Sequence, residues 1–451
     1  MADKYDLVVV GGGPGGIEAA KCAGTAGKRV LIIEKSGWGG TCTHRGCIPT
    51  KALLACSKHY ADLKKLKRLG INVASAGFDF AAIKKHQQQM VKTAALGAQK
   101  ILAGANVTMK TGEAEILSAR EILTVDPAGE IENVTTDNIV IAWGSETQIL
   151  PGINLSERIL TSDSILNLDF LPGSIVIIGG SFIGIELATF LAELGVEVTL
   201  LEMLERILPQ KDEEAAVLLT QEMTRAGIAV HTGAQLTAVT EKNNRVFITA
   251  RKNSGQVELS ADYALLCTGR KPSLRINELE RSGISYDKKG IKVNEQMMTS
   301  VAGIYAVGDV TGGMMLAHRA AEQGKVAACT VCGLVPPQYN ENFIPSVVYS
   351  HPQVAHVGFT KHSAYALGIN IEVLQSGYGA NIIARTELLG QGFAQALFYQ
   401  DKIIGATLVG EHAADLIAPL ALAVSQAMTR KQLRSWVIPH PTLSEIFTTL
   451  L

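Results

Sequence analysis

The stretch that decides the fold is residues 5–16, which read YDLVVVGGGPGG. A short β-rich run, Tyr5–Val10, leads into Gly11, Gly13 and Gly16, the G-x-G-x-x-G pattern. An alanine-rich helical segment follows, and a second apolar run at 29–33 ends in Glu34. Strand, glycine turn, helix, strand and acidic residue in this order predict a βαβ unit that binds a dinucleotide.

Each glycine has a physical reason to be there. Gly11 permits a tight turn, Gly13 lets the backbone approach a pyrophosphate, and Gly16 lets the helix pack on the strand. The free N–H groups of the helix N-terminus favour phosphate, and Glu34 can accept hydrogen bonds from ribose hydroxyls. A glycine triplet alone could be only a structural turn, but the strand, helix and acid around it favour nucleotide binding.

The same plan recurs at residues 174–184, which read SIVIIGGSFIG, followed by a helix through Leu194 and a strand at 197–201. Glu202 ends this strand and lies 23 residues after the first glycine, as Glu34 does in the first copy. Ser181 takes the place of the middle glycine, where it narrows the space for a pyrophosphate but can also hydrogen-bond it. Glu202 favours NAD over NADP, because a carboxylate repels the 2′-phosphate. Arg206 is nearby but beyond the strand end.

Composition limits the class of protein. The chain has 451 residues with a net charge of −1, and 47% of them are apolar and 18% charged, as in a folded protein with a large core. The balanced charge gives no reason to expect nucleic acid or an anionic membrane as a partner. We find no signal-like start and no apolar run near the ~20 residues that span a bilayer, so a cytoplasmic location is expected. Seven cysteines are too few for a disulfide scaffold.

The rest of the chain alternates between segment types. Residues 51–105 are mostly helical with a break at 70–77, and 107–141 and 235–266 have the patterns of a β meander and of hairpins. A strand that enters a turn is expected at 300–309, and an α+β region from about residue 341. Within it, 416–428 is expected to be a buried helix.

Two cysteines follow the first nucleotide unit in residues 39–51, GGTCTHRGCIPTK. Cys42 and Cys47 are five apart, which in an ideal helix separates the Cα atoms by about 8.7 Å. A disulfide needs less than about 7 Å, so the segment must be irregular if the bridge forms, and Gly46 and Pro49 make this plausible. A zinc site is a poor rival, since no second Cys or His pair is nearby at ligand spacing.

This segment resembles the redox-active disulfide of the pyridine nucleotide–disulfide oxidoreductases, and its wording is closest to the dihydrolipoamide dehydrogenases. The resemblance covers nearly the whole chain. Further matching segments are Ala142–Ser145 with an unusual Trp143, the Gly-Arg-x-Pro turn at Gly269–Pro272, the second FAD motif at Thr299–Asp309, Leu316–His318, and Ile344–Tyr349 with His351-Pro352.

The resemblance implies roles for the residues around the cysteines. Cys42 is then the interchange thiol that attacks substrate sulfur, and Cys47 is the charge-transfer thiol against the flavin. Lys51 lies one helical turn after Cys47. The family pairs this lysine with a glutamate after the second glycine motif, here Glu186, beside the reactive flavin nitrogen. A solvated helix lysine is the plain alternative for Lys51.

A histidine near the end of the chain is the expected base. His440 precedes Pro441 and Thr442, and Glu445 follows five residues after the histidine. An imidazole can take a thiol proton near neutral pH while a carboxylate orients it. The resembling family has this motif, and its pair serves the active site of the partner subunit, which implies a homodimer. Ile438 stands where family members often have another histidine.

The resemblance therefore implies an α/β fold with two Rossmann-like FAD/NAD-binding domains and a C-terminal α+β dimerisation domain. Its segments are expected at 1–145 (FAD), 146–268 (NAD), 269–340 (second part of the FAD domain) and 341–451 (dimerisation). Each subunit should hold one FAD tightly, through Gly11, Gly13, Gly16, Glu34, Thr41, Lys51, Ala114, Gly144, Asp309 and Ala317. NAD should bind through Gly179, Gly180, Ser181, Gly184, Glu202 and Gly269.

The implied activity is the oxidation of protein-bound dihydrolipoamide with reduction of NAD⁺. The expected partner is a lipoyl-bearing protein of a 2-oxoacid dehydrogenase or glycine cleavage system. Two alternatives stay open: a reductase of another small disulfide, as in glutathione reductase, and a non-catalytic docking subunit. Cys329 and Cys332 are expected to be buried core residues, and Cys22, Cys56 and Cys267 are expected to act as small apolar residues.

Overall fold

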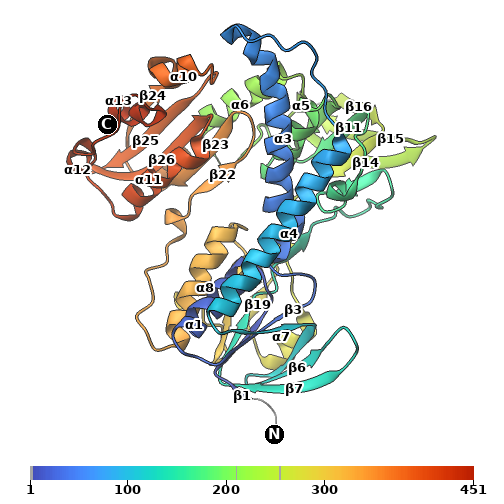
Figure 1. Ribbon diagram of the computed structural model, residues 1–451, viewed down its shortest axis with the longest axis vertical. Coiled ribbons are helices and arrows are strands. Elements are labelled where there is room, and N and C mark those ends of the chain that lie inside the picture. Colours follow the sequence, from blue (N-terminus) through green and yellow to red (C-terminus); the bar gives the residue numbers. More distant parts are fainter. Residues whose placement is uncertain (1–3, 210, 253–254) are drawn as a thin grey trace. The chain divides into compact units, whose positions relative to one another are not determined.

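The computed structural model describes residues 4–209, 211–252 and 255–451, which divide into two compact units (Figure 1). The first unit comprises Met1–Ala52, Lys85–Gln148 and Arg270–Tyr339, and the second comprises Leu53–Lys84, Ile149–Gly269 and Asn340–Leu451. The finer division into four segments stays a prediction. Among the helices in these ranges, none has both the length and the apolar character needed to cross a membrane.

A five-stranded parallel sheet forms the centre of the first unit, in the order β21-β8-β2-β3-β4. Its strands are β2 (Leu7–Val10), β3 (Val30–Glu34), β4 (Thr108–Thr111), β8 (Ile139–Ile141) and β21 (Ile304–Ala306). Side chains alternate along a strand, so Leu7 and Val9 join one buried cluster while Val8 and Val10 join another. A continuous run of valines can therefore be buried on both faces.

The two faces of this sheet are covered by different elements. Helices α1 (Pro14–Thr25) and α8 (Ala317–Val331) cover the face of Leu7 and Val9. An antiparallel meander covers the other face, formed by β5 (Glu113–Ser118), β6 (Glu121–Val125) and β7 (Ile131–Thr136). Helix α1 packs closely on α8, because a Cβ on Gly324 would lie 2.4 Å from the carbonyl oxygen of Gly15.

The second unit repeats this plan. Its parallel sheet has the order β10-β17-β11-β12-β13, with β10 (Ile159–Thr161), β11 (Ser174–Ile178), β12 (Glu197–Leu201), β13 (Ala229–His231) and β17 (Tyr263–Leu266). Helix α5 (Phe182–Glu193) joins β11 to β12, as α1 joins β2 to β3, and α6 (Glu213–Arg225) follows β12. The meander β14 (Ala234–Lys242), β15 (Arg245–Lys252) and β16 (Gly255–Ala261) corresponds to β5–β7.

A separate antiparallel sheet ends the chain, in the order β22-β23-β26-β25-β24 (Figure 1). Its strands are β22 (Ser346–Val348), β23 (Gln353–Gly358), β24 (Glu372–Gly377), β25 (Phe393–Tyr399) and β26 (Lys402–Gly410). Helix α11 (Ala413–Ser425) packs against β23 and β26, and α13 (Ile446–Leu450) against β24 and β25. Short helices α9 (Lys361–Ala366), α10 (Ile382–Thr386) and α12 (Arg430–Arg434) complete this region.

The remaining elements connect these sheets. They are β1 (Lys4–Tyr5), α2 (Gly40–Arg45), α3 (Cys47–Leu66), α4 (Phe80–Gly104), β9 (Ser145–Thr147), β18 (Arg270–Pro272), α7 (Ile276–Ser282), β19 (Tyr286–Asp287), β20 (Gly290–Ile291) and short 3₁₀ turns that include η3 (Gly308–Thr311) and η6 (Leu443–Glu445).

The predicted α/β class with two Rossmann-like domains and a C-terminal α+β domain is confirmed. Several boundaries were wrong. The region 107–141 is not one meander, because β4 and β8 at its ends join the parallel sheet. Likewise β17 leaves the hairpins of 235–266 to pair with β10 and β11. The apolar helix begins at Ala413 rather than 416 and contains Pro419 within it.

Candidate active site

The first glycine turn has the geometry that a bound pyrophosphate requires. Gly11 has φ +115°, and a Cβ there would lie 2.2 Å from the carbonyl oxygen of Ala142. A Cβ on Gly16 would lie 2.0 Å from the carbonyl oxygen of Gly11, so the helix and turn are in contact. At Gly13 a Cβ would meet nothing within 4 Å. The turn is therefore closed at its ends and open in the middle, where the phosphates would approach.

Glu34 is fixed at the carboxyl end of the same sheet. Its Oε2 accepts a hydrogen bond from Gly12 N at 2.6 Å, and its Oε1 accepts one from Ser36 N at 2.6 Å. The residue is buried, yet its carboxylate keeps unused lone pairs that could receive ribose hydroxyls. The residues present thus fit a dinucleotide such as FAD.

The second turn repeats these contacts. Gly179 has φ +117° and Gly184 packs on its carbonyl oxygen, where a Cβ would lie 1.9 Å away. Glu202 Oε2 accepts from Gly180 N at 2.6 Å, and Oε1 accepts from Leu204 N at 2.8 Å. Ser181 is exposed at the start of α5, and its side chain makes no capping bond to that helix. Its hydroxyl therefore remains available to a phosphate.

The other predicted cofactor residues lie in the same units as their turns. Gly144 has φ +71° directly before β9, and the carbonyl oxygen of Ala114 accepts a hydrogen bond from Arg275. Half-buried Thr41 lies in α2, Ala317 begins α8, and Gly269, with φ +102°, follows β17.

Asp309 is held by partners that sequence reasoning missed. Its Oδ2 accepts a hydrogen bond from Ser145 Oγ at 2.6 Å, and Ser145 Oγ accepts in turn from Arg270 Nε at 2.8 Å. Arg270 also donates to the carbonyl oxygen of Ser145 at 2.8 Å. Ser145 and Arg270 both lie in quoted family motifs, but only the pairing of β9 with β18 shows that they act together.

The segment around the cysteines is irregular, as their spacing required. Helix α2 ends at Arg45, Gly46 leaves the helical region with φ −145° and ψ −108°, and α3 begins at Cys47. Cys42 and Cys47 are free thiols whose side chains hydrogen-bond each other. Lys51 lies in the first turns of α3, so it is a helical residue close to the thiols.

The pKa of the Cys42 thiol is raised above its ordinary value. The largest cause is the side-chain hydrogen bond to Cys47, followed by burial, while the charge of Lys51 acts in the opposite direction. A thiol whose proton is held in this way does not ionise readily near neutral pH. Chemistry at Cys42 therefore calls for a base or for an adjacent positive charge.

Glu186 lies buried in α5, and its Oε1 accepts a hydrogen bond from Tyr349 N at 3.0 Å. It belongs to the second unit and Lys51 to the first. Their pairing stays a prediction.

His440 and Glu445 form the expected pair. His440 Nδ1 lies 2.8 Å from Glu445 Oε1, and Thr442 N donates to Glu445 Oε2 at 3.0 Å. Because the ionised carboxylate only accepts, Nδ1 carries the proton and Nε2 is left as the basic nitrogen. The bond to His440 lowers the pKa of Glu445. The imidazole side chain is 75% exposed in this chain, so a second molecule could cover it.

The expectation of buried core residues was wrong for Cys329 and Cys332, which are half-buried. Of the three cysteines expected to act as small apolar residues, Cys267 is buried and Cys22 packs half-buried against the core of the first unit, whereas Cys56 is half-buried. Cys332 lies just after α8, where the helix has ended. Cys22 Sγ lies 3.4 Å from Glu18 Oε1, and burial together with Glu18 raises the pKa of this thiol to about 11. Burial also raises the pKa values of Cys56 and Cys332, so Cys22, Cys56 and Cys332 are poor nucleophiles despite their partial exposure.

Fold and site define a class of protein: the chain belongs to the pyridine nucleotide-disulphide oxidoreductases. That family matches residues 5–324, and its dimerisation domain matches residues 344–451. Among its relatives is a dihydrolipoyl dehydrogenase of Geobacillus stearothermophilus, 36% identical over 99% of this chain and 95% of the relative. One from Bacillus subtilis strain 168 is 34% identical over 98% of this chain and 95% of the relative.

Solved structures have the same fold. LpdA from Mycobacterium tuberculosis superposes with a TM-score of 0.93 at 26% identity, covering 100% of this chain and 99% of that one. The HOCl-induced flavoprotein disulfide reductase RclA from Escherichia coli superposes with a TM-score of 0.86 at 25% identity, covering 99% of both chains.

Proposed function

We propose that this chain is a dihydrolipoyl dehydrogenase, which oxidises a dihydrolipoyl dithiol through Cys42 and Cys47 and reduces NAD⁺. The observation that carries the proposal is the hydrogen-bonded thiol pair at the break between α2 and α3, which follow the first βαβ nucleotide unit. Full-length relatives of this name at 36% and 34% identity support the choice of substrate and disfavour the two alternatives.

Family membership brings FAD and a pyridine nucleotide as cofactors, as predicted. When bound, FAD accepts an electron pair from the enzyme dithiol and delivers it to NAD⁺ as hydride. The open turn at Gly13 and the fixed carboxylate of Glu34 would hold FAD, and Ser181 and Glu202 would hold NAD.

The thiol chemistry follows from the side chains. A substrate thiolate attacks Cys42 Sγ of the oxidised enzyme, the Cys42–Cys47 bond breaks, and Cys47 leaves as a thiolate. The second substrate thiol then attacks the substrate sulfur of the mixed disulfide, and the bond between that sulfur and Cys42 Sγ breaks. The proton of this second thiol passes to Cys42, so the cyclic disulfide is released and Cys42 is left as a thiol. His440 Nε2 takes the proton from the substrate thiol, and Glu445 stabilises the resulting imidazolium.

The chain contains the family's dimerisation domain. A homodimer is the finer proposal, in which His440 serves the cysteine pair of its partner subunit. The exposure of an imidazole that a carboxylate already orients supports this arrangement. A lipoyl-bearing protein of a 2-oxoacid dehydrogenase or glycine cleavage system is the proposed macromolecular partner, and a cytoplasmic location stays a prediction.

The decisive experiment compares NAD⁺ with dihydrolipoamide against NADPH with oxidised glutathione, using wild type and Cys42→Ser. Wild type should turn over only the first pair, and Cys42→Ser should lose this activity by about 10³-fold or more while it retains flavin. Cys329→Ser is the matched control, since Cys329 is a half-buried thiol in α8, and it should keep full activity. Normal turnover by Cys42→Ser would refute the assignment.

A further inference from the structure

Two carboxylates of helix α5 hold one short segment of the C-terminal sheet. Glu186 and Glu193 are seven residues apart, so they lie two turns apart on the same face of the helix. Glu186 accepts from Tyr349 N at 3.0 Å, and Glu193 Oε1 lies 2.5 Å from His351 Nδ1. The loop between β22 and β23 is therefore tied to α5 at residues 349 and 351.

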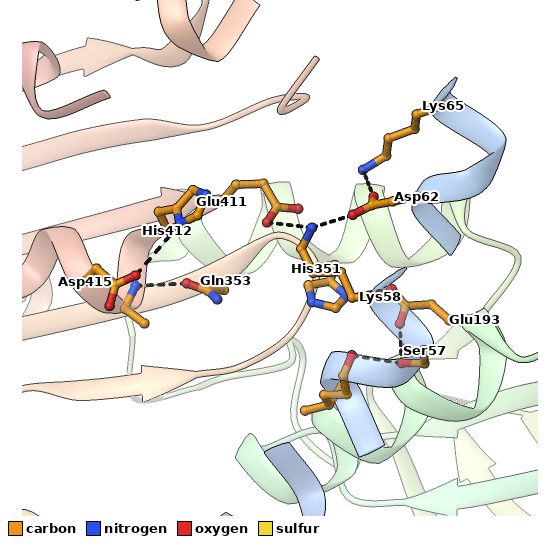
Figure 2. Close-up of polar contacts among 12 residues, drawn as sticks. Ser57, Lys58, Asp62, Lys65, Glu193, His351, Gln353, Glu411, His412 and Asp415 are labelled. Atoms are coloured by element: carbon orange, nitrogen blue, oxygen red, sulfur yellow. Dashed lines mark hydrogen bonds and ion pairs between the residues drawn. The ribbon is translucent and has the colours of Figure 1, made fainter. Parts of the chain in front are cut away.

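Glu193 also binds helix α3. Its Oε2 accepts a hydrogen bond from Ser57 Oγ at 2.6 Å, so the single carboxylate joins Ser57 on one side to His351 on the other (Figure 2). Ser57 is fully buried, and the side chains of His351 and Glu193 are 15% and 13% exposed. Since an ionised carboxylate only accepts, His351 Nδ1 must be the donor.

This network differs from its neighbours in Figure 2. Lys58 pairs with Asp62 at 2.6 Å and with the buried Glu411 at 3.4 Å, but the Lys58 side chain is 31% exposed. His412 lies 3.7 Å from Asp415 in a pair whose side chains are 56% and 86% exposed. An exposed pair of this kind contributes little to stability or geometry. Charge-assisted bonds in a mostly buried site are stronger and fix the side chains that they join.

Loss of the His351–Glu193 bond would affect Glu186 through the backbone of residues 349–351. The Tyr349 N–H can orient the Glu186 carboxylate only while residues 349–351 keep their place along α5, and the His351–Glu193 bond is a side-chain contact that holds this loop to the helix. The buried residues Val348, Ser350 and Val354 also hold the loop, so loss of the His351–Glu193 bond should loosen residues 349–351 and weaken the Tyr349–Glu186 bond without releasing the loop.

We propose that Ser57, Glu193 and His351 form a positioning network that fixes Glu186 through the Tyr349 amide. The inference rests on the proposed function and on the role that the family resemblance gives Glu186, beside the reactive nitrogen of the flavin. None of the three residues touches the substrate. They act by restraining the one carboxylate of α5 that does contribute to electron transfer.

The test uses the purified holoenzyme in three variants. His351→Phe removes the donor, His351→Asn restores a donor close to the position of Nδ1, and Asp415→Asn removes the carboxylate of the exposed His412–Asp415 pair as a matched control. Three quantities are measured: amide hydrogen exchange of residues 346–351, the rate at which NADH reduces the bound flavin, and the flavin midpoint potential.

In His351→Phe we expect faster amide exchange, about tenfold slower flavin reduction, and a more positive midpoint potential, because a mobile Glu186 carboxylate would repel the negative charge of the reduced flavin less strongly. His351→Asn should return all three values towards wild type, and Asp415→Asn should match wild type.

Unchanged reduction rate and potential in His351→Phe, with only a lower melting temperature, would reduce the network to a structural role and overturn the proposal. Failure of the proposed function is a separate result: wild type would then reduce its flavin with NADH but would not oxidise dihydrolipoamide. The His351 variants would still test the network in that case, because amide exchange, flavin reduction by NADH and the midpoint potential are measured without the lipoyl substrate.

Discussion

Lys211 donates a hydrogen bond from Nζ to Ser346 Oγ at 2.5 Å, although the lysine is only 7% exposed. Its ammonium group lies 5.5 Å from the ring centre of Phe182, the first residue of α5. Burial lowers the pKa of Lys211 to about 8, and the adjacent Asp212 only partly opposes this effect. The buried surroundings of Lys211 therefore disfavour its charged form.

Stability should rise with pH between about 8 and the ordinary lysine value of 10.5. In this window the unfolded chain binds a proton that the folded chain has lost, so alkaline pH favours the folded state, by at most about 3 kcal/mol. Lys211→Met removes the group. The variant should be more stable than wild type near pH 7, and this advantage should shrink as the pH approaches 10.5.

Thermal unfolding of both proteins across pH 7–10.5 checks this prediction, and only their difference is read, because thiols and tyrosines titrate in both. Ser346 Oγ keeps a bond to the His356 carbonyl oxygen at 3.4 Å in the variant. A stability difference between the two proteins that stays constant across this pH range would show that deprotonation of Lys211 does not stabilise the fold.

Replacing Glu445 by Gln should separate two half-reactions. A glutamine amide can donate to His440 Nδ1, which places the imidazole proton on Nε2 and removes the base. Oxidation of dihydrolipoamide should fall by about 10²-fold or more, while reduction of the bound flavin by NADH stays unchanged. Stopped-flow measurement of each step distinguishes them, and an equal loss in both would argue for a folding defect instead.

Acid pH should also affect the hydrogen-bonded pair His440 and Glu445. Because the hydrogen bond to His440 lowers the pKa of Glu445, the paired form persists above the ordinary value for glutamate and is lost as the pH falls through the lowered one. Protonation of Glu445 should therefore not limit lipoamide oxidation until the pH falls below the ordinary value for glutamate. The pH profiles of wild type and Glu445→Gln check this prediction, and a Glu445-dependent loss of activity that begins above the ordinary glutamate value would contradict it.

Alanine at two glycines of the first turn should affect different properties, FAD affinity at Gly13 and stability of the fold at Gly16. Gly13 has φ −76° and open space beside it, so Gly13→Ala should leave the apoprotein's melting temperature unchanged but lower its affinity for FAD. Gly16→Ala would place a Cβ 2.0 Å from Gly11 O and should destabilise the fold. Flavin content and thermal unfolding of the apoproteins measure the two effects, and equal destabilisation would contradict the open cradle at Gly13.

Glu202→Gln should weaken the preference for NAD over NADP by about tenfold or more, since it removes the charge that repels a 2′-phosphate. The ratio of kcat/KM values for the two coenzymes measures this effect. Glu34→Gln is the control, because Glu34 makes the matching bonds in the first turn and should change flavin binding but leave the coenzyme ratio alone. A ratio that shifts equally in both variants would count against Glu202.

The sequence predicted the parallel sheets well, because runs such as Val8–Val10 and Ile175–Ile178 are apolar on both faces and end in a glycine turn. It did not predict the limits of the meanders. Thr108–Thr111 has the length and polarity of a meander strand, but it pairs in parallel with β3. Short strands carry too little pattern to reveal which partner they will choose.

Local spacing also predicted the pairs that lie close in sequence, such as His440 with Glu445. It could not predict the network around Glu193, whose partners Ser57 and His351 lie 136 and 158 residues away. No periodicity links such positions, and each residue alone resembles an ordinary polar side chain near a helix end. Only the folded arrangement of α3, α5 and the β22–β23 loop brings them together.

The duplicated turns bear on how long each coenzyme stays bound. Gly12 with Glu34 and Gly180 with Glu202 have the same 2.6 Å contact, so this contact does not distinguish a resident prosthetic group from a coenzyme that must depart every cycle. That difference must come from the side chain of Ser181, which stands where the first turn has Gly13, and from accessory segments such as η3 with Asp309 and the start of α8. Changes at the Gly13 position or in the accessory segments should therefore alter residence times, whereas the two shared carboxylate contacts should not account for the difference.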